Sequence, residues 1–289
     1  MKTSLHYSLH ALQQQQNRTV ATCFQHDFLL RCMEERLLER LEFMRLAPAV
    51  IVEIGPGSSA AMLSGRFPNA LRVACDVSHA LLKRYRQRDN QQASALQCSP
   101  FRLPFADNSV DCLVSNCRFH WSLDANALLQ DCHRVLKPGG LLLFSVLGPE
   151  TLKQLKMAWA SVSNTAHVND FADMHEWGDA LVKAGYFEPV VDRQLLDVTY
   201  MDVQTALDDL KGMGSHNWLI DRAKGLTTPR QLQRLASELE SFRDADQRLP
   251  MTYELIFAQA WVLDKATYAA EGGQTVKIPL QAIPIRRRD

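Results

Sequence analysis

Two glycines follow the first short apolar run of the sequence and come just before a helical stretch. The run 49–52 is mostly β-branched, the turn reads Glu53-x-Gly55-x-Gly57, and residues 60–67 have a helical pattern. Glycine lets the backbone turn sharply and approach a ligand closely, and amide groups at a helix start point toward such a ligand. We therefore predict that this turn binds a cofactor.

An aspartate ends the next predicted strand, which covers residues 70–75. Parallel strands end at one edge of a sheet, so Asp76 is expected beside the glycine turn, where a carboxylate can accept hydrogen bonds from both hydroxyls of a ribose. A structural alternative stays open, in which the glycines only make a tight turn and Asp76 caps the following helix.

The glycine spacing distinguishes two kinds of cofactor. The dinucleotide pattern G-x-G-x-x-G has its third glycine where this chain has Ala60, and a pyrophosphate disfavours a carboxylate such as Glu53 ahead of the turn. A cationic cofactor without phosphate suits an acidic turn better. S-adenosylmethionine fits this description, and we predict it in place of a nicotinamide dinucleotide.

Strands and helices alternate through the first half of the chain, which predicts an α/β fold with a doubly wound, Rossmann-like parallel sheet. Two later strand-like stretches, 187–198 and 253–264, are expected to complete the sheet as an antiparallel edge. The chain is expected to divide into an N-terminal helical segment (1–48), a cofactor-binding core (49–200), a helical cap insertion (201–248), a return strand (249–265) and a C-terminal tail (266–289).

Composition narrows the class of protein. The chain has 289 residues, 46% of them hydrophobic, and 32 basic residues balance 32 acidic ones, so no global charge favours nucleic acid or a membrane surface. Seven scattered cysteines without a CxxC pair are typical of reduced thiols, and they indicate neither a disulfide framework nor a metal site. With no apolar stretch long enough to span a bilayer, we expect a cytoplasmic protein.

Four segments taken together resemble the class I S-adenosylmethionine-dependent methyltransferases. They are 52–57, Asp76, 103–111 and 134–140. The resemblance implies that the cofactor's methionine part faces Gly55, Gly57 and Ser59, and that its adenine faces the segment from Ser99 to Leu103. Glu53 and Asn116, at or next to strand ends, complete the expected cofactor set.

Further segments resemble one branch, the BioC-type malonyl-acyl-carrier-protein O-methyltransferases of biotin synthesis. They are 27–29 with 35–41, 115–116, Trp121, 147–155, 174–175, 178–182, 209–214 and 249–254. The resemblance implies methyl transfer to the free carboxylate of malonyl-acyl carrier protein. Because a complex I assembly factor that acts on a protein arginine shares several of these segments, an arginine-modifying enzyme stays open as an alternative. A second alternative is a non-catalytic assembly protein. It is supported by two departures from the family's cofactor motifs, Ser59 in place of a glycine and Ser99 where an acid is usual.

Arg118 and His120, which follow Asn116 in the chain, are candidates for contact with the methyl acceptor. His120 is able to orient or deprotonate a substrate, and Arg118 to pair with a substrate carboxylate; the alternatives are a packed histidine and an exposed arginine. A carboxylate is already ionised at neutral pH, so the predicted reaction needs no strong base. A basic cluster in the cap is able to meet an acidic carrier protein; the alternative is a charged helix face that is only solvated. Its members are Arg222, Lys224, Arg230 and Arg234.

Overall fold

The structure is a computed structural model that describes most of the chain between residues 25 and 264. The described residues are 13, 14, 17, 20, 22, 25–55, 57, 60–89, 93–99, 102–122, 124–214 and 225–264. Ser59 and the predicted tail (266–289) lie outside them. None of the described helices is long and apolar enough to cross a membrane.

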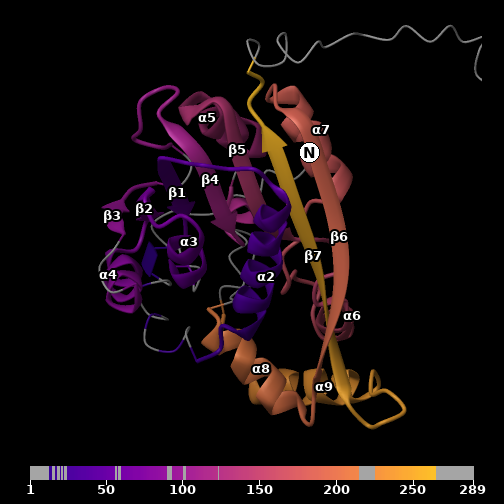
Figure 1. The fold of residues 1–289 in the computed structure, drawn as a ribbon. Coiled ribbons are helices and arrows are strands. Elements are labelled where there is room, and N and C mark those ends of the chain that lie inside the picture. Colours follow the sequence, from indigo (N-terminus) through magenta and orange to yellow (C-terminus); the bar gives the residue numbers. More distant parts are fainter. Residues whose placement is uncertain are drawn as a thin grey trace, which may run out of the picture.

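A mixed sheet forms the centre of the molecule. Its seven described strands have the order β3-β2-β1-β4-β5-β7-β6 (Figure 1). The strands are β1 (Val50–Ile54), β2 (Leu71–Asp76), β3 (Ser94–Gln97), β4 (Val110–Asn116), β5 (Leu136–Leu147), β6 (Phe187–Tyr200) and β7 (Leu249–Trp261). The first five are parallel, and β7 runs antiparallel to both β5 and β6. The doubly wound sheet and its antiparallel edge are thus confirmed.

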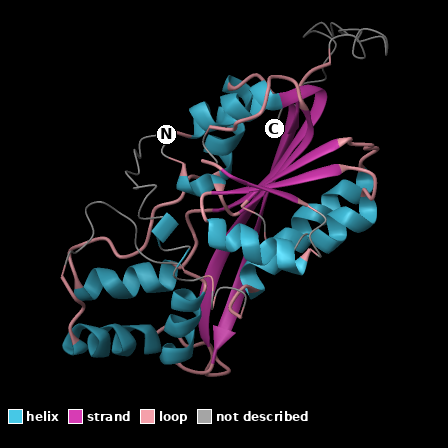
Figure 2. Ribbon diagram, turned by 90° about the vertical axis from the view of Figure 1, so that its left-hand side faces the viewer, coloured by secondary structure: helices cyan, strands magenta, loops and turns pink. Residues whose placement is uncertain are grey.

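Helices cover both faces of the sheet (Figure 2). They are α2 (Phe28–Glu39), η1 (Arg40–Phe43), α3 (Ala60–Arg66), α4 (His79–Arg88), η2 (Phe119–Trp121), α5 (Ala125–Val135), α6 (Lys153–Val162), α7 (Met174–Lys183), α8 (Val203–Gly212) and α9 (Pro229–Glu240). Side chains alternate along a strand, so Ile51 packs with α2 on one face while Val52 packs with α5 on the other. This alternation builds two apolar cores, one on each face of the sheet.

The hairpin of β6 and β7 extends well beyond β5. Leu147, at the end of β5, lies opposite Leu255, whereas the hairpin continues to the pair of Tyr200 and Leu249. Helices α8 and α9 follow at this far end, on the side of the sheet where the parallel strands finish (Figure 1). The hairpin therefore carries the two helices toward the edge at which ligands bind in such sheets.

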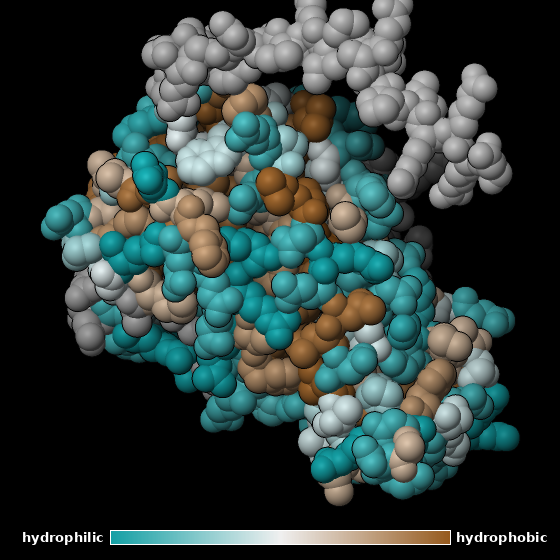
Figure 3. Space-filling model, turned by 45° about the vertical axis from the view of Figure 1, so that its right-hand side comes forward, coloured by the Kyte–Doolittle hydropathy of each residue, from teal (hydrophilic) through white to brown (hydrophobic). Residues whose placement is uncertain are grey.

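The edge strand β6 exposes a mixture of charged and apolar side chains. Val190 and Leu195 are exposed, and Arg193 and Asp197 lie exposed between and after them. Figure 3 shows apolar and hydrophilic side chains interspersed over the face on which this strand lies. Charges along an edge strand discourage pairing with a second chain.

Two elements differ from the expectation drawn from sequence. Strand β3 was not predicted, because its residues are mostly exposed and show no apolar alternation; it forms by pairing with β2. The run 137–140, with one proline and two glycines, predicts a break before a strand at Leu141, but β5 begins at Leu136. The amide of Gly139 donates to the carbonyl of Val262 and so holds this glycine segment in the sheet.

A buried ion cluster fixes β1, β2 and α4 together. Arg72 is 3% exposed and lies 2.6 Å from Asp89 and 3.7 Å from Glu53. The hydroxyl of Tyr85 donates to Glu53 at 2.7 Å. Burial, with the negative charge of Glu53, raises the pKa of Tyr85, so this hydroxyl stays protonated and continues to donate.

Replacing Arg72 with methionine should strongly destabilise the protein. The change keeps the length of the side chain but leaves Glu53 and Asp89 buried without a counter-charge, which costs about 3 to 5 kcal/mol. Urea unfolding of both proteins measures the difference. In the control, Lys156→Met removes an ion pair with Asp170 whose side chains are both more than half exposed, and this should change stability by no more than about 0.5 kcal/mol. Equal stability of wild type and the Arg72 variant would contradict the role of the cluster.

Candidate active site

The predicted cofactor residues gather where three neighbouring strands end. Gly55 follows β1, Asp76 ends β2 and Asn116 ends β4, and the sheet order β2-β1-β4 places them in a row. Gly55 has a φ of +66°, a conformation that side chains disfavour, and its amide donates to the carbonyl of Cys75 at 2.8 Å. The glycine turn therefore lies between the other two strand ends, with Asp76 beside it as predicted.

Asp76 is buried at this edge with a positive side chain beside it. It is 3% exposed, accepts a hydrogen bond from the amide of Ser78 at 2.7 Å, and lies 3.7 Å from the guanidinium of Arg118. Burial raises the pKa of Asp76 above its usual value, while the charge of Arg118 and the amide of Ser78 oppose that rise. The amide of Ser78 lies two residues along, so Asp76 also stabilises the turn into α4.

Arg118 crosses the glycine turn. A Cβ atom built on Gly55 would lie 2.1 Å from both Cγ and Nε of Arg118, so the arginine packs directly against the bare backbone. Its side chain starts after β4, passes over the end of β1 and reaches Asp76 at the end of β2. Of the two roles open from sequence, an exposed arginine does not fit, because 22% of the side chain is exposed.

A second charged residue, Glu34, covers the other glycine. It belongs to α2, is 3% exposed, and its carboxylate oxygens lie 2.8 and 2.9 Å from where a Cβ on Gly57 would be. Sequence reasoning did not identify this residue. The available signal was an acid within the apolar face of a helix, one residue after Met33 and three before Leu37.

Glu53 and Asn116 lie at the site but bind other parts of the chain. Glu53 contacts Tyr85 and Arg72 in the buried cluster described above. The amide nitrogen of Asn116 donates to the carbonyl of Leu30 at 2.8 Å, and its oxygen accepts from the hydroxyl of Ser145 at 2.5 Å. Asn116 thereby ties α2 to β4 and β5, and contact of either residue with a cofactor stays a prediction.

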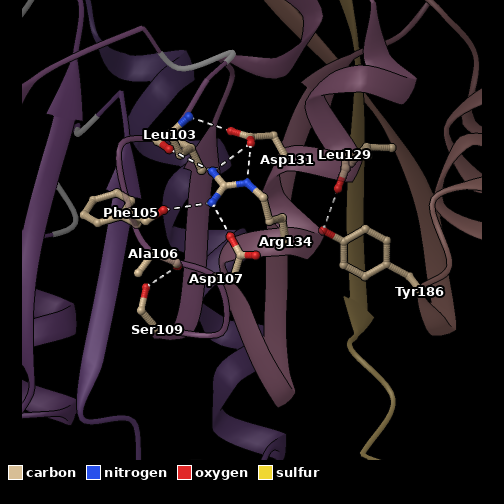
Figure 4. Close-up of polar contacts among 9 residues, drawn as sticks. All are labelled: Leu103, Phe105, Ala106, Asp107, Ser109, Leu129, Asp131, Arg134 and Tyr186. Carbon is tan, nitrogen blue, oxygen red and sulfur yellow. Dashed lines mark hydrogen bonds and ion pairs between the residues drawn. The ribbon is translucent and has the colours of Figure 1, made fainter.

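Arg134 holds the segment that contains Leu103 (Figure 4). It donates to the carbonyls of Leu103 and Phe105 at 2.9 and 2.8 Å, and it pairs with Asp107 and Asp131. The amide of Leu103 also donates to Asp131 at 2.5 Å. The segment from 103 to 107 is thus fixed to α5, although its sequence is rich in turn residues.

Ser99 precedes that segment and follows strand β3, which is next to β2 in the sheet. The amide of Cys98 donates to the carbonyl of Asp76 at 3.1 Å, so Ser99 lies just beyond the neighbouring ends of β2 and β3. Its side chain is half-buried. The position is compatible with the expected adenine contact, which stays a prediction.

His120 packs against aromatic rings. Its ring centroid lies 4.8 Å from that of Trp121 and 5.6 Å from that of Phe171. Its Nδ1 is buried and has no hydrogen-bond partner within the described part of the chain. Burial, with the charge of Arg118 adding to it, lowers the pKa of His120 to about 3, so the ring is neutral at physiological pH.

Helix α8, which follows β6, contacts His26 just before the start of α2. Nδ1 of His26 lies 2.7 Å from the carboxylate of Asp209 on α8, and the ring of His26 lies against Gly212. Of the predicted basic cluster, Arg230 and Arg234 belong to α9, while Arg222 and Lys224 lie outside the described residues. Helix α8 is thus seated beside the segment that leads to Glu34.

Chemically, the strand ends offer two glycines without side chains of their own, the buried carboxylates of Glu34 and Asp76, and the guanidinium of Arg118. Carboxylates so close to a backbone turn favour a ligand that carries hydroxyl groups and positive charge. The neutral histidine and its aromatic neighbours lie on the side of Arg118, and they offer packing and no proton acceptor of ordinary basicity.

Comparison with known proteins places the chain in a family. A family model described as a methyltransferase domain matches residues 52–144. The chain is 39% identical over 260 residues to malonyl-acyl-carrier-protein O-methyltransferase 1 of Coxiella burnetii, which covers 89% of each chain. It is 39% identical over 240 residues to the protein of that activity in Gallionella capsiferriformans, covering 80% of this chain and 82% of the other. The YcgJ protein of Bacillus subtilis shares the fold, with a TM-score of 0.56 at 16% identity over 81% of this chain and 99% of the other. The chain therefore belongs to the malonyl-acyl-carrier-protein O-methyltransferase family and has the class I methyltransferase fold.

Proposed function

We propose that this protein transfers a methyl group from S-adenosylmethionine to the free carboxylate of malonyl-acyl carrier protein, a step of biotin synthesis. The observation that carries the proposal is the row of Gly55, Gly57 and buried Asp76 at adjoining strand ends, in a chain whose relatives are named for this reaction. The site and the family thus support the same chemistry.

The residues present fit such a cofactor. Gly55 and Gly57 leave backbone uncovered by their own side chains, and Asp76 supplies a carboxylate for ribose hydroxyls. Glu34 adds negative charge beside Gly57, which favours a cationic ligand. The cofactor supplies an electrophilic methyl group on a sulfonium. Arg118 crosses this space, and its flexible side chain has to turn aside for the ribose to reach Asp76.

The protein's task in the reaction is to align the acceptor with the methyl group and to exclude water. The acceptor carboxylate is ionised well below neutral pH and is already nucleophilic. Alignment of acceptor oxygen with the methyl group can lower the barrier by several kcal/mol. Arg118 is the residue that would attract the acceptor carboxylate, and His120 and Trp121 would pack beside it. Very tight pairing with Arg118 would lower the nucleophilicity of that carboxylate.

Residues 201–248 would act as a cap over the acceptor side. Helix α8 already contacts the start of α2 through His26 and Asp209. A carrier protein presents its acyl group on a long arm, so a cap of helices at the strand ends suits this substrate better than a closed cavity does. Arg230 and Arg234 on α9 would meet the acidic carrier, and the opposite charges would favour association of the two proteins.

Asp76→Ala should weaken binding of S-adenosylmethionine by about 1 to 3 kcal/mol, because the ribose hydroxyls lose their acceptor. Titration calorimetry on both proteins measures the effect. Asp170→Ala, which changes an exposed carboxylate of the loop before α7, is the control and should bind as wild type does. Equal affinity of wild type and the Asp76 variant would remove Asp76 from the cofactor site.

Incubation with S-adenosylmethionine and malonyl-acyl carrier protein should add one methyl group to the carrier, measured as a mass shift. Acetyl-acyl carrier protein, which lacks the free carboxylate, should gain none. Cofactor binding without methylation of the malonyl carrier would favour a different acceptor, such as a protein arginine. Failure to bind the cofactor at all would favour a non-catalytic protein of this fold.

His120→Asn should retain most of the maximal rate, since no proton has to leave the acceptor. The pKa of His120 is lowered to about 3, so the ring is neutral at any higher pH and its protonation affects the rate only as the pH falls toward that value. The rate at saturating substrates should therefore show no ionisation of this group between about pH 5 and pH 8. Loss of the maximal rate with unchanged affinities would instead assign proton transfer to His120.

A further inference from the structure

Arg118 lies along the crevice in which the proposed cofactor would bind. In the sheet, β1 separates β4 from β2, so a side chain that starts after β4 and contacts Asp76 has to pass over the end of β1. The close approach of Arg118 to Gly55 shows that it does so in contact with the backbone. In open α/β sheets this crevice, outside the carboxyl ends of the strands, is the place where ligands bind.

The backbone before Arg118 is held so that the side chain points this way. Cys117 has a φ of +55°, a left-handed conformation that is strained for a residue other than glycine. Its amide donates to the carbonyl of Ser145 at 3.0 Å, and its sulfur lies 3.4 Å from that of Met33 in the core. Neighbouring structure thus stabilises the strained turn, and the direction of Arg118 follows from the fold.

Asp76 also needs a positive partner in the absence of ligand. Its carboxylate is almost fully buried, and an isolated charge there would be costly. Arg118, at 3.7 Å, reduces that cost. A ribose bound to Asp76 would occupy the space that the guanidinium and its side chain now fill. The two cannot be accommodated together in this conformation.

We propose that Arg118 is an internal competitor of the cofactor, which closes the crevice onto Asp76 until S-adenosylmethionine displaces it. The inference rests on the proposed function and deepens it by assigning an order of binding. Once displaced, the guanidinium is the positive charge next to His120 and Trp121, where the acceptor carboxylate would lie. Cofactor binding therefore prepares the acceptor site, and the cofactor binds first.

The first test is the affinity for S-adenosylhomocysteine, measured by calorimetry on the whole protein. Arg118→Ala and Arg118→Met both remove the charge, and Met keeps much of the packing on Gly55. Both should bind about five- to tenfold more tightly than wild type if the closed form is populated some five- to tenfold over the open one. Arg45→Ala removes an exposed arginine that comes before β1 and should leave the affinity unchanged. Thermal unfolding checks that every variant is folded.

The second test is the affinity of malonyl-acyl carrier protein with and without S-adenosylhomocysteine. In wild type the nucleoside should tighten carrier binding, because it releases Arg118 to the acceptor side. In both Arg118 variants the carrier should bind more weakly, and the nucleoside should no longer tighten it. If Arg118 had only a structural role, replacing it would weaken the binding of both ligands. Opposite changes in the two affinities therefore identify Arg118 as a competitor.

The outcomes separate this inference from the proposed function. If wild type binds S-adenosylhomocysteine and the Arg118 variants bind it equally or more weakly, Arg118 is no competitor and the proposed function stands. If only the variants bind it, Arg118 blocks the crevice but the cofactor does not displace it in wild type, so the order of binding and the proposed function are both rejected. If neither wild type nor variants bind it, both the proposed function and the competitor are rejected.

Discussion

The parallel pairing of β1 with β2 on one side and β4 on the other is the constraint on which the site depends. Val52 lies opposite Val73 and Leu113, and this register brings the ends of the three strands level. Asp76, Gly55 and Arg118 then meet although they are far apart in the chain. A shift of one residue would turn alternate side chains to the wrong face of the sheet, so two buried cores enforce the register.

Charge at the strand ends forms two groups. In the first, Glu53 is compensated by Arg72 and by the hydroxyl of Tyr85. In the second, Glu34 lies against Gly57, and Asp76 lies 3.7 Å from Arg118, which packs on Gly55. Because buried charges are costly without partners, the first group fixes the fold, and in the proposed function a ligand replaces the partners of the second.

The hairpin of β6 and β7 links the sheet to helices α8 and α9. Its far half has no other strand beside it among the described residues, and it is held instead by contacts with the segment after β5. The amide of Glu150 donates to the buried carboxylate of Glu254, and Gln154 exchanges hydrogen bonds with Thr252. These bonds set where α8 and α9 lie relative to the crevice. In the proposed function, the position of α8 and α9 relative to the crevice decides how a carrier-bound acyl group enters.

The sequence by itself determined the alternation of strands and helices, the glycine turn and the position of Asp76 at a strand end, because each depends on a short stretch of neighbouring residues. It also indicated the antiparallel edge, through two long alternating stretches. Only the tertiary structure decided that Arg118 covers Gly55, that Glu34 covers Gly57 and that Glu53 is bound to Arg72. Strand β3 and the early start of β5 were decided there too. The physical reason is the same in each case: the partners come from distant parts of the chain, and only the packed sheet and its covering helices bring them within contact.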